Sequence, residues 1–251
     1  MQNLVCKSNV VMSFYFHKVL ILEDTKWLEL FENIEVYSKL KMTYLDEKDP
    51  LRNKISNFKE AAEYINGLNK NKNSWYIGGK IGKPMQIYLT IQSSKNKNED
   101  AYPDKVSFCF EKINLQEEGV GEYLKVFFIK IIETLEPFYA ICDIQDAISK
   151  KKKKTGFPIN IQCELTGIFW LTYFNDIYSH YLGFDKLPSH INEKLNKGSL
   201  ISLGKSLSKI EILGSEIEKL IGNSHFVDIN TTLDKPIGKY VLTFESLNKL
   251  D

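Results

Sequence analysis

The feature that most constrains the fold is the apolar and aromatic run from Glu164 to Phe184, ELTGIFWLTYFNDIYSHYLGF. From Ile168 to Phe174 nearly every residue is apolar, which is typical of a strand buried on both faces. Asn175 and Asp176 then favour the start of a helix, and Gly183 favours its end. The run therefore predicts a strand, a short link and a two-turn helix that anchor the core.

Strands and helices come in groups along the rest of the chain. Predicted strands or extended segments cover Val10–Ile21, Trp75–Ile77, Met85–Ile91, Val106–Phe110, Phe138–Ile148 and Ser199–Leu203. Predicted helices cover Phe58–Leu68, a segment from Glu117 to Leu135, a turn at His190–Leu195, and Ser208–Ile221. The last of these is predicted to face inward with Ile210, Leu213, Ile217, Leu220 and Ile221. This order predicts an α+β fold with an antiparallel or mixed β-sheet covered by helices. We expect a single compact domain over 1–251, with 1–115 and 116–251 as alternative sub-halves.

Composition excludes several classes of protein. The chain is 43% hydrophobic and 26% charged, with a formal net charge of +1, so no strong field favours nucleic acid or anionic membranes. Arg52 is the only arginine, which also disfavours phosphate recognition. No apolar stretch is long enough to span a bilayer, and the first residues lack the pattern of a signal peptide. We therefore expect a cytoplasmic protein with no nucleic-acid or membrane partner.

No motif for a metal or cofactor is present. The four cysteines form no CxxC pair. The glycine-rich segment Gly78–Pro84 lacks the spacing of a phosphate-binding loop, and Pro84 offers no hydroxyl for magnesium, so a hairpin turn is expected. The lysine run Lys150–Lys154 is typical of a solvated loop. The sequence thus predicts neither a metal site nor a cofactor.

Asp143 and Asp146 interrupt an apolar segment and are candidate partner-binding residues, together with Asp176. Three residues apart on a strand, Asp143 and Asp146 would point to opposite faces, which argues against a shared acid–base site. On an exposed edge they could contact a basic partner surface. An enzyme would have to use scattered residues such as these two, Cys163 and His180, so no catalytic residue is assigned.

The run Gly167-Ile168-Phe169-Trp170-Leu171-Thr172-Tyr173, followed by Tyr178 and Gly183, resembles the signature of the immunity protein 52 family of bacterial polymorphic-toxin systems. The signature residues Gly167, Trp170, Tyr173 and Gly183 are expected to lie in the core. Thr172 stands where the family tends to carry asparagine, and a threonine hydroxyl can replace an asparagine amide only in part.

The resemblance implies a non-enzymatic immunity protein that binds and neutralises a cognate antibacterial toxin, such as a nuclease effector delivered by type VI secretion. Two alternatives remain: another protein-binding module of phage defence or anti-defence, and an enzyme with an unrecognised site. The sequence does not identify the toxin, the interface residues, the mode of inhibition or the oligomeric state.

Overall fold

The computed structural model describes residues 7–18, 24–38, 42–81, 87–95, 102–151, 160–204, 210–233 and 235–250. The chain divides into two compact units. The first comprises Met1–Phe14, Val19–Asn96 and Asp104–Glu136, and the second comprises Tyr15–Lys18, Lys97–Pro103 and Pro137–Asp251. Each unit combines antiparallel strands with helices, which confirms the predicted α+β class.

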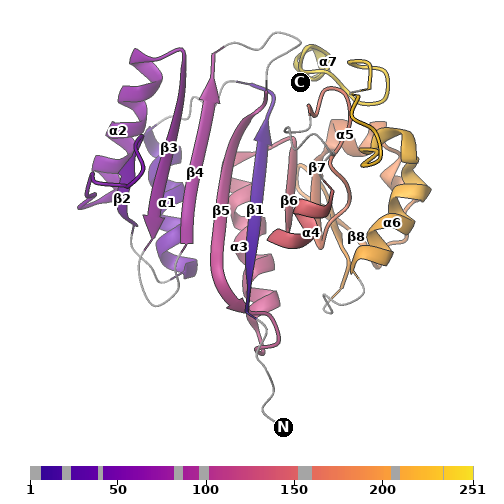
Figure 1. Cartoon of the computed structure of the whole chain (residues 1–251), viewed down its shortest axis with the longest axis horizontal. Helices are drawn as coiled ribbons and strands as arrows, with labels where there is room; N and C mark the ends of the chain where they lie inside the picture. Colours follow the sequence, from indigo (N-terminus) through magenta and orange to yellow (C-terminus); the bar gives the residue numbers. More distant parts are fainter. Residues whose placement is uncertain are drawn as a thin grey trace. The chain divides into compact units, whose positions relative to one another are not determined.

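The sheet of the first unit contains the predicted meander. Its strands, in spatial order, are β2 (Met42–Asp46), β3 (Ser74–Ile81), β4 (Ile87–Ser94), β5 (Asp104–Asn114) and β1 (Lys7–Phe16), as Figure 1 shows. β4 pairs antiparallel with both β3 and β5. Gly78 and Gly79 lie within β3 and not in the predicted turn, while residues 82–86 lie outside the described residues. β1 ends at Phe16 and not at the predicted Ile21, since residues 17–18 are no longer strand, and residues 19–23 lie outside the described part.

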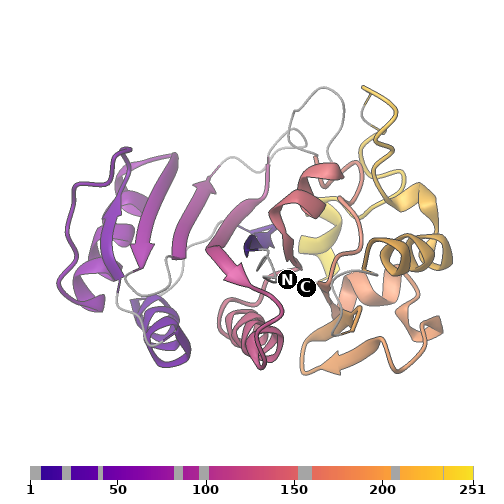
Figure 2. The same ribbon diagram turned by 60° about the horizontal axis from the view of Figure 1, so that its bottom comes forward.

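Three helices belong to the first unit: α1 (Asp24–Ser38), α2 (Phe58–Asn71) and α3 (Val120–Leu135). Asn57 caps α2 as predicted, because its side chain accepts a hydrogen bond from the Glu60 backbone N–H at 2.9 Å. In Figure 2, α1 and α3 lie side by side below the strands. Phe128 of α3 packs against Phe14 of β1, with 5.2 Å between ring centroids. Helix α3 thus contributes aromatic side chains to the core of this unit.

The sheet of the second unit is built around the aromatic run. Its strands, in spatial order, are β6 (Tyr139–Ile144), β7 (Leu171–Asn175), β9 (Gly198–Ser202) and β8 (Asn192–Leu195), and all their pairings are antiparallel. Its helices are α4 (Gln145–Lys150), α5 (Asp176–Tyr181), α6 (Ile210–Ile221) and α7 (Phe244–Leu250). No helix in the described part of the chain is both long and apolar enough to cross a membrane.

The aromatic run forms a strand followed by a helix, as predicted. The strand begins at Leu171, three residues later than the predicted Ile168. Asn175 caps α5 by accepting the Tyr178 backbone N–H at 3.0 Å. The rings of Tyr139 and Phe174 stack with 4.8 Å between centroids. Each such buried aromatic side chain contributes about 1.5–3 kcal/mol through the removal of apolar surface from water.

Three predictions about the second unit are wrong. The segment predicted as extended through Ile148 turns into α4 after Ile144, and the turn predicted at His190–Leu195 contains strand β8, which pairs with β9. Leu213 and Leu220, predicted to face inward, are 37% and 69% exposed, whereas Ile217 is buried. Helix α6 instead presents Gly214 to the fold, because the missing side chain lets the helix approach the Ile168 carbonyl.

Candidate functional site

The second unit contains a cavity of about 570 Å³ lined by α4, residues 168–169, α6 and residues 227–229. Its apolar lining consists of Ile144, Ala147, Ile168, Phe169, Val227 and Ile229. Its polar lining consists of Asp143, Asp146, Lys150, Lys151, Ser215, Glu218 and Asp228. Its volume lies in the range of ligand-binding pockets, and its lining mixes apolar side chains with polar and charged ones.

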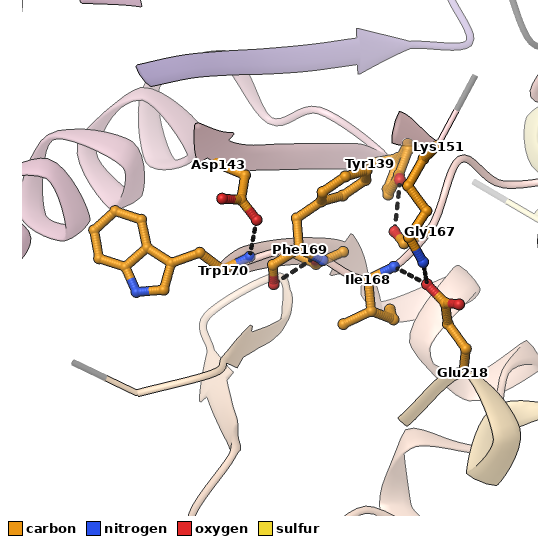
Figure 3. Close-up of polar contacts among 9 residues, drawn as sticks. Tyr139, Asp143, Lys151, Gly167, Ile168, Phe169, Trp170 and Glu218 are labelled. Carbon is orange, nitrogen blue, oxygen red and sulfur yellow. Dashed lines mark hydrogen bonds and ion pairs between the residues drawn. The ribbon is translucent and has the colours of Figure 1, made fainter. Parts of the chain in front are cut away.

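Asp143, at the end of β6, connects this strand to the segment before β7. Its carboxylate is buried and accepts two backbone N–H groups, one from Ile144 at 2.7 Å and one from Trp170 at 3.0 Å. Figure 3 shows the bond to Trp170. The two N–H groups thus satisfy a carboxylate that is removed from water. Asp143 therefore holds the cavity wall in place, and its bond to Ile144 lies at the point where β6 turns into α4.

Glu218 of α6 holds the other end of the same segment. Its Oε1 accepts the Ile168 backbone N–H at 2.8 Å and the Lys151 ammonium at 2.6 Å (Figure 3). The side chains of Lys151 and Glu218 are only 21% and 12% exposed, so the ion pair is shielded from water. Lys151 thus lines the cavity and forms an ion pair, whereas the lysine run was predicted to be a solvated loop. Lys152–Lys154 lie outside the described residues.

Gly167 fits beside the Lys151–Glu218 ion pair because it lacks a side chain. Its φ of +151° is one that residues with a side chain rarely adopt. A Cβ atom there would lie 2.8 Å from Glu218 Oε1 and 3.2 Å from Lys151 Nζ. The buried Tyr139 hydroxyl donates to the Gly167 carbonyl at 3.2 Å. Burial raises the pKa of Tyr139 well above its ordinary value, so this donor keeps its proton.

The rim of the cavity carries exposed charges. Asp146 in the first turn of α4 and Asp228 are both exposed. Asp228 Oδ1 accepts the Asn230 backbone N–H at 2.9 Å, which fixes the local turn. Lys150, at the end of α4, is also exposed. The described lining residues include four carboxylates and two ammonium groups, a formal excess of two negative charges within that set.

The structure brings Asp143 and Asp146 to one cavity, because Asp146 follows the end of the strand and belongs to α4. Asp176 lies elsewhere, exposed in the first turn of α5, where it pairs with Lys194 of β8. Sequence reasoning missed Glu218 and Asp228 as site residues. Both are far from Asp143 in the chain, and no local pattern marks either one as a neighbour of the aromatic run.

The residues that carry the family resemblance lie inside the second unit. Trp170 is 5% exposed, and its indole N–H donates to the Gly204 carbonyl at 2.8 Å. The buried Tyr173 donates its hydroxyl to the Lys197 carbonyl at 2.8 Å. Gly183 adopts a left-handed φ of +70° after α5. Through these contacts Trp170 and Tyr173 attach β7 and the residue before it to the backbone at Gly204 and Lys197.

Thr172, the departure from the family signature, bonds the backbone of the aromatic run. Its hydroxyl accepts the Phe169 N–H at 2.8 Å and lies 3.3 Å from the Phe169 carbonyl, to which it donates. The residue is fully buried. A single threonine hydroxyl therefore satisfies both backbone groups of Phe169.

Cys163 and His180, the other two residues considered for catalysis, are not among the described residues that line the cavity. Cys163 is buried, whereas His180 is exposed on α5. Burial raises the pKa of the Cys142 thiol well above its ordinary value, which disfavours the reactive thiolate. Within the described ranges, no group of three or more His, Cys, Asp or Glu side chains is arranged to hold a metal ion.

No protein-family model matches the chain, and no curated protein matches it in sequence. Among solved structures, the fold is similar to that of the Pseudomonas aeruginosa T6SS protein PA0821, with a TM-score of 0.55. The two proteins are 13% identical, and the match covers 97% of this chain and 82% of that chain. At this identity the likeness establishes a shared fold.

Proposed function

We propose that this chain is a cytoplasmic, non-enzymatic immunity protein that binds a cognate antibacterial toxin and neutralises it. The observation that carries the proposal is the fold likeness to a T6SS protein over 97% of the chain. Type VI secretion delivers toxins between bacteria, and a producing cell must protect itself and its sisters. A nuclease effector is one toxin of this kind.

The aromatic run from Glu164 to Phe184 gives a second, independent reason for the proposal. It resembles the immunity protein 52 signature, and its polar groups bond the backbone of the same unit. An inhibitor of this kind needs a rigid scaffold and a complementary surface, and it needs no reacting groups. The run supplies the scaffold, and the cavity beside it supplies a concave surface with an apolar floor and a charged rim.

An enzyme is the second candidate, because four carboxylates line a cavity of about 570 Å³. Two of them already have structural partners: Asp143 accepts two backbone N–H groups, and Glu218 accepts one together with the Lys151 ammonium. General acid–base catalysis needs a carboxyl group that is available to the substrate. Asp143 and Glu218 are therefore engaged in holding the cavity wall, and an acid–base role would fall to the exposed Asp146 and Asp228. A phage-defence module would use the same binding chemistry with another partner.

Growth rescue tests the proposal. The immunity hypothesis expects a toxin gene beside the gene for this chain. Expression of that toxin alone should stop growth of a bacterial host, and co-expression of this chain should restore it, with both proteins recovered as one complex. As controls, the same vector without an insert and one carrying an unrelated immunity protein should give no rescue. Failure of both rescue and co-purification would contradict the proposal.

A further inference from the structure

We propose that the cavity beside α4 and α6 receives a lysine or arginine side chain that projects from the partner protein. The identity of that partner rests on the proposed function, whereas the chemistry of the cavity does not. The occupant is defined by two properties of the lining: its negative charge and its apolar floor.

The first property is an excess of carboxylates. The Lys151 ammonium is matched by Glu218 at 2.6 Å. Lys150 can balance at most one of the other three carboxylates, Asp143, Asp146 and Asp228. Within the described lining, carboxylates therefore outnumber ammonium groups by two, and a cationic guest would be attracted to the exposed Asp146 and Asp228. The same excess would repel a nucleic-acid phosphate or a carboxylate guest.

The second property is the apolar floor. The floor is formed by Ile168 and Phe169, which are 3% and 2% exposed. Ile229 lies at the rim and is 42% exposed. Lysine and arginine carry methylene stems that pack against apolar surface while their charged ends reach polar groups. A purely apolar guest would place uncharged atoms against Asp146 and Asp228, and a small inorganic cation would leave the apolar surface uncovered.

The wall is fixed before any guest arrives. The 167–170 segment is held at one end by Glu218 and at the other by Asp143, through hydrogen bonds of 2.8 Å and 3.0 Å (Figure 3). Little conformational entropy is then lost on binding, so a single projecting side chain can act as an anchor. Asp146 and Asp228 lie exposed at the mouth, where a guest would first meet the protein.

The cavity chemistry is tested on the full chain without any partner. The probes are N-acetyl-arginine methylamide and N-acetyl-lysine methylamide, and N-acetyl-glutamine methylamide is the neutral match. In ¹H–¹⁵N NMR titrations, the cationic probes should shift the amide signals of Ala147, Ser215 and Asp228 more than the neutral probe does. The D146N/D228N variant should reduce these shifts. Equal shifts with all three probes, or none at these amides, would overturn the inference.

The partner complex supplies the second test. The D146K/D228K variant should bind the neighbouring toxin at least about tenfold more weakly than the unmodified chain. The E32K/E63K variant changes the net charge equally at two exposed positions of the first unit and should bind normally. A ¹H–¹⁵N spectrum that changes only near the substituted positions establishes that each variant is folded.

The two tests separate the two ways of failing. If the unmodified chain does not bind the toxin, the proposed function fails, and the probe titration alone decides the cavity chemistry. If the toxin binds D146K/D228K and E32K/E63K equally well, the partner does not use the cavity and the inference fails while the function stands. Probe binding combined with that result would indicate a free cationic ligand, such as a polyamine, in place of a partner side chain.

Discussion

Glu218 accepts the backbone N–H of Ile168 at 2.8 Å, although fifty residues separate them in the chain. The same oxygen binds the Lys151 ammonium, so one carboxylate joins α6, the end of α4 and the segment before β7. This contact fixes the wall of the cavity.

Loss of the Glu218 carboxylate should destabilise the fold. E218A removes the partner of a shielded ammonium and of a backbone N–H, and should lower the free energy of unfolding by about 2–3 kcal/mol. E218Q keeps an oxygen that can accept from Ile168 and should cost less. Urea denaturation measures both. Because the Glu216 side chain is exposed on the same helix, E216Q serves as the control and should change the free energy of unfolding by less than about 0.5 kcal/mol. Equal stability of E218A and E216Q would show that the contact contributes little.

Two glycines within helices should respond to alanine in opposite directions. A Cβ atom at Gly67 in α2 would meet nothing within 4 Å, so G67A should stabilise the protein by about 0.5–1 kcal/mol. A Cβ atom at Gly214 in α6 would lie 2.7 Å from the Ile168 carbonyl oxygen. G214A should therefore destabilise the protein, by about 1–3 kcal/mol. Thermal unfolding of the two variants compares them directly. A stabilising G214A would contradict the close packing of α6 on the cavity wall.

The contrast between local and distant signals explains which features the sequence could predict. The Asn57 cap and the helix after Asn175 follow from side chains within four residues of the feature they determine. The start of α4 carries no such local signal, because its N-cap residue, Ile144, makes no side-chain cap hydrogen bond.

Local sequence was also insufficient to predict the orientation of α6 and the full set of cavity residues. The apolar periodicity of α6 predicted the burial of Ile217 correctly but that of Leu213 and Leu220 wrongly, since the helix approaches Ile168 at Gly214. Asp143 and Asp146 were recognised as candidates. Glu218 and Asp228 reach the cavity only through tertiary packing, so they left no signal in the sequence.

Thr172 should be needed for its hydroxyl. T172V keeps the shape but leaves the buried Phe169 N–H without its acceptor, and should cost about 1–3 kcal/mol. T172S keeps the hydroxyl and loses one methyl group, so it should retain most of the stability. Denaturant titrations of the pair separate hydrogen bonding from packing. If T172S were as unstable as T172V, packing of the methyl group would be the cause.

Stability should fall at alkaline pH because of buried tyrosines. Burial raises the pKa of Tyr123 to about 12, and burial also raises that of Tyr178. Above pH 10 the unfolded chain releases these protons while the folded chain retains them, so unfolding becomes more favourable as the pH rises through 10 to 12. Free energies of unfolding between pH 8 and about 11.5 measure the slope.

The Tyr123→Phe variant identifies one source of that slope. The Tyr123 hydroxyl is buried and has no hydrogen-bond partner among the described residues, so Y123F should keep or improve stability at pH 7 and reduce the alkaline loss. Tyr76 is 53% exposed, and Y76F should leave the slope unchanged. Identical alkaline profiles for Y123F and the unmodified chain would exclude Tyr123 as a contributor.

The central claim is that this chain neutralises a toxin by binding it. The most direct measurement titrates the purified chain into the purified product of the neighbouring toxin gene and follows the remaining toxin activity. Inhibition should be complete at one equivalent, with a dissociation constant on the order of nanomolar or below. Full toxin activity in the presence of excess folded chain would contradict the claim.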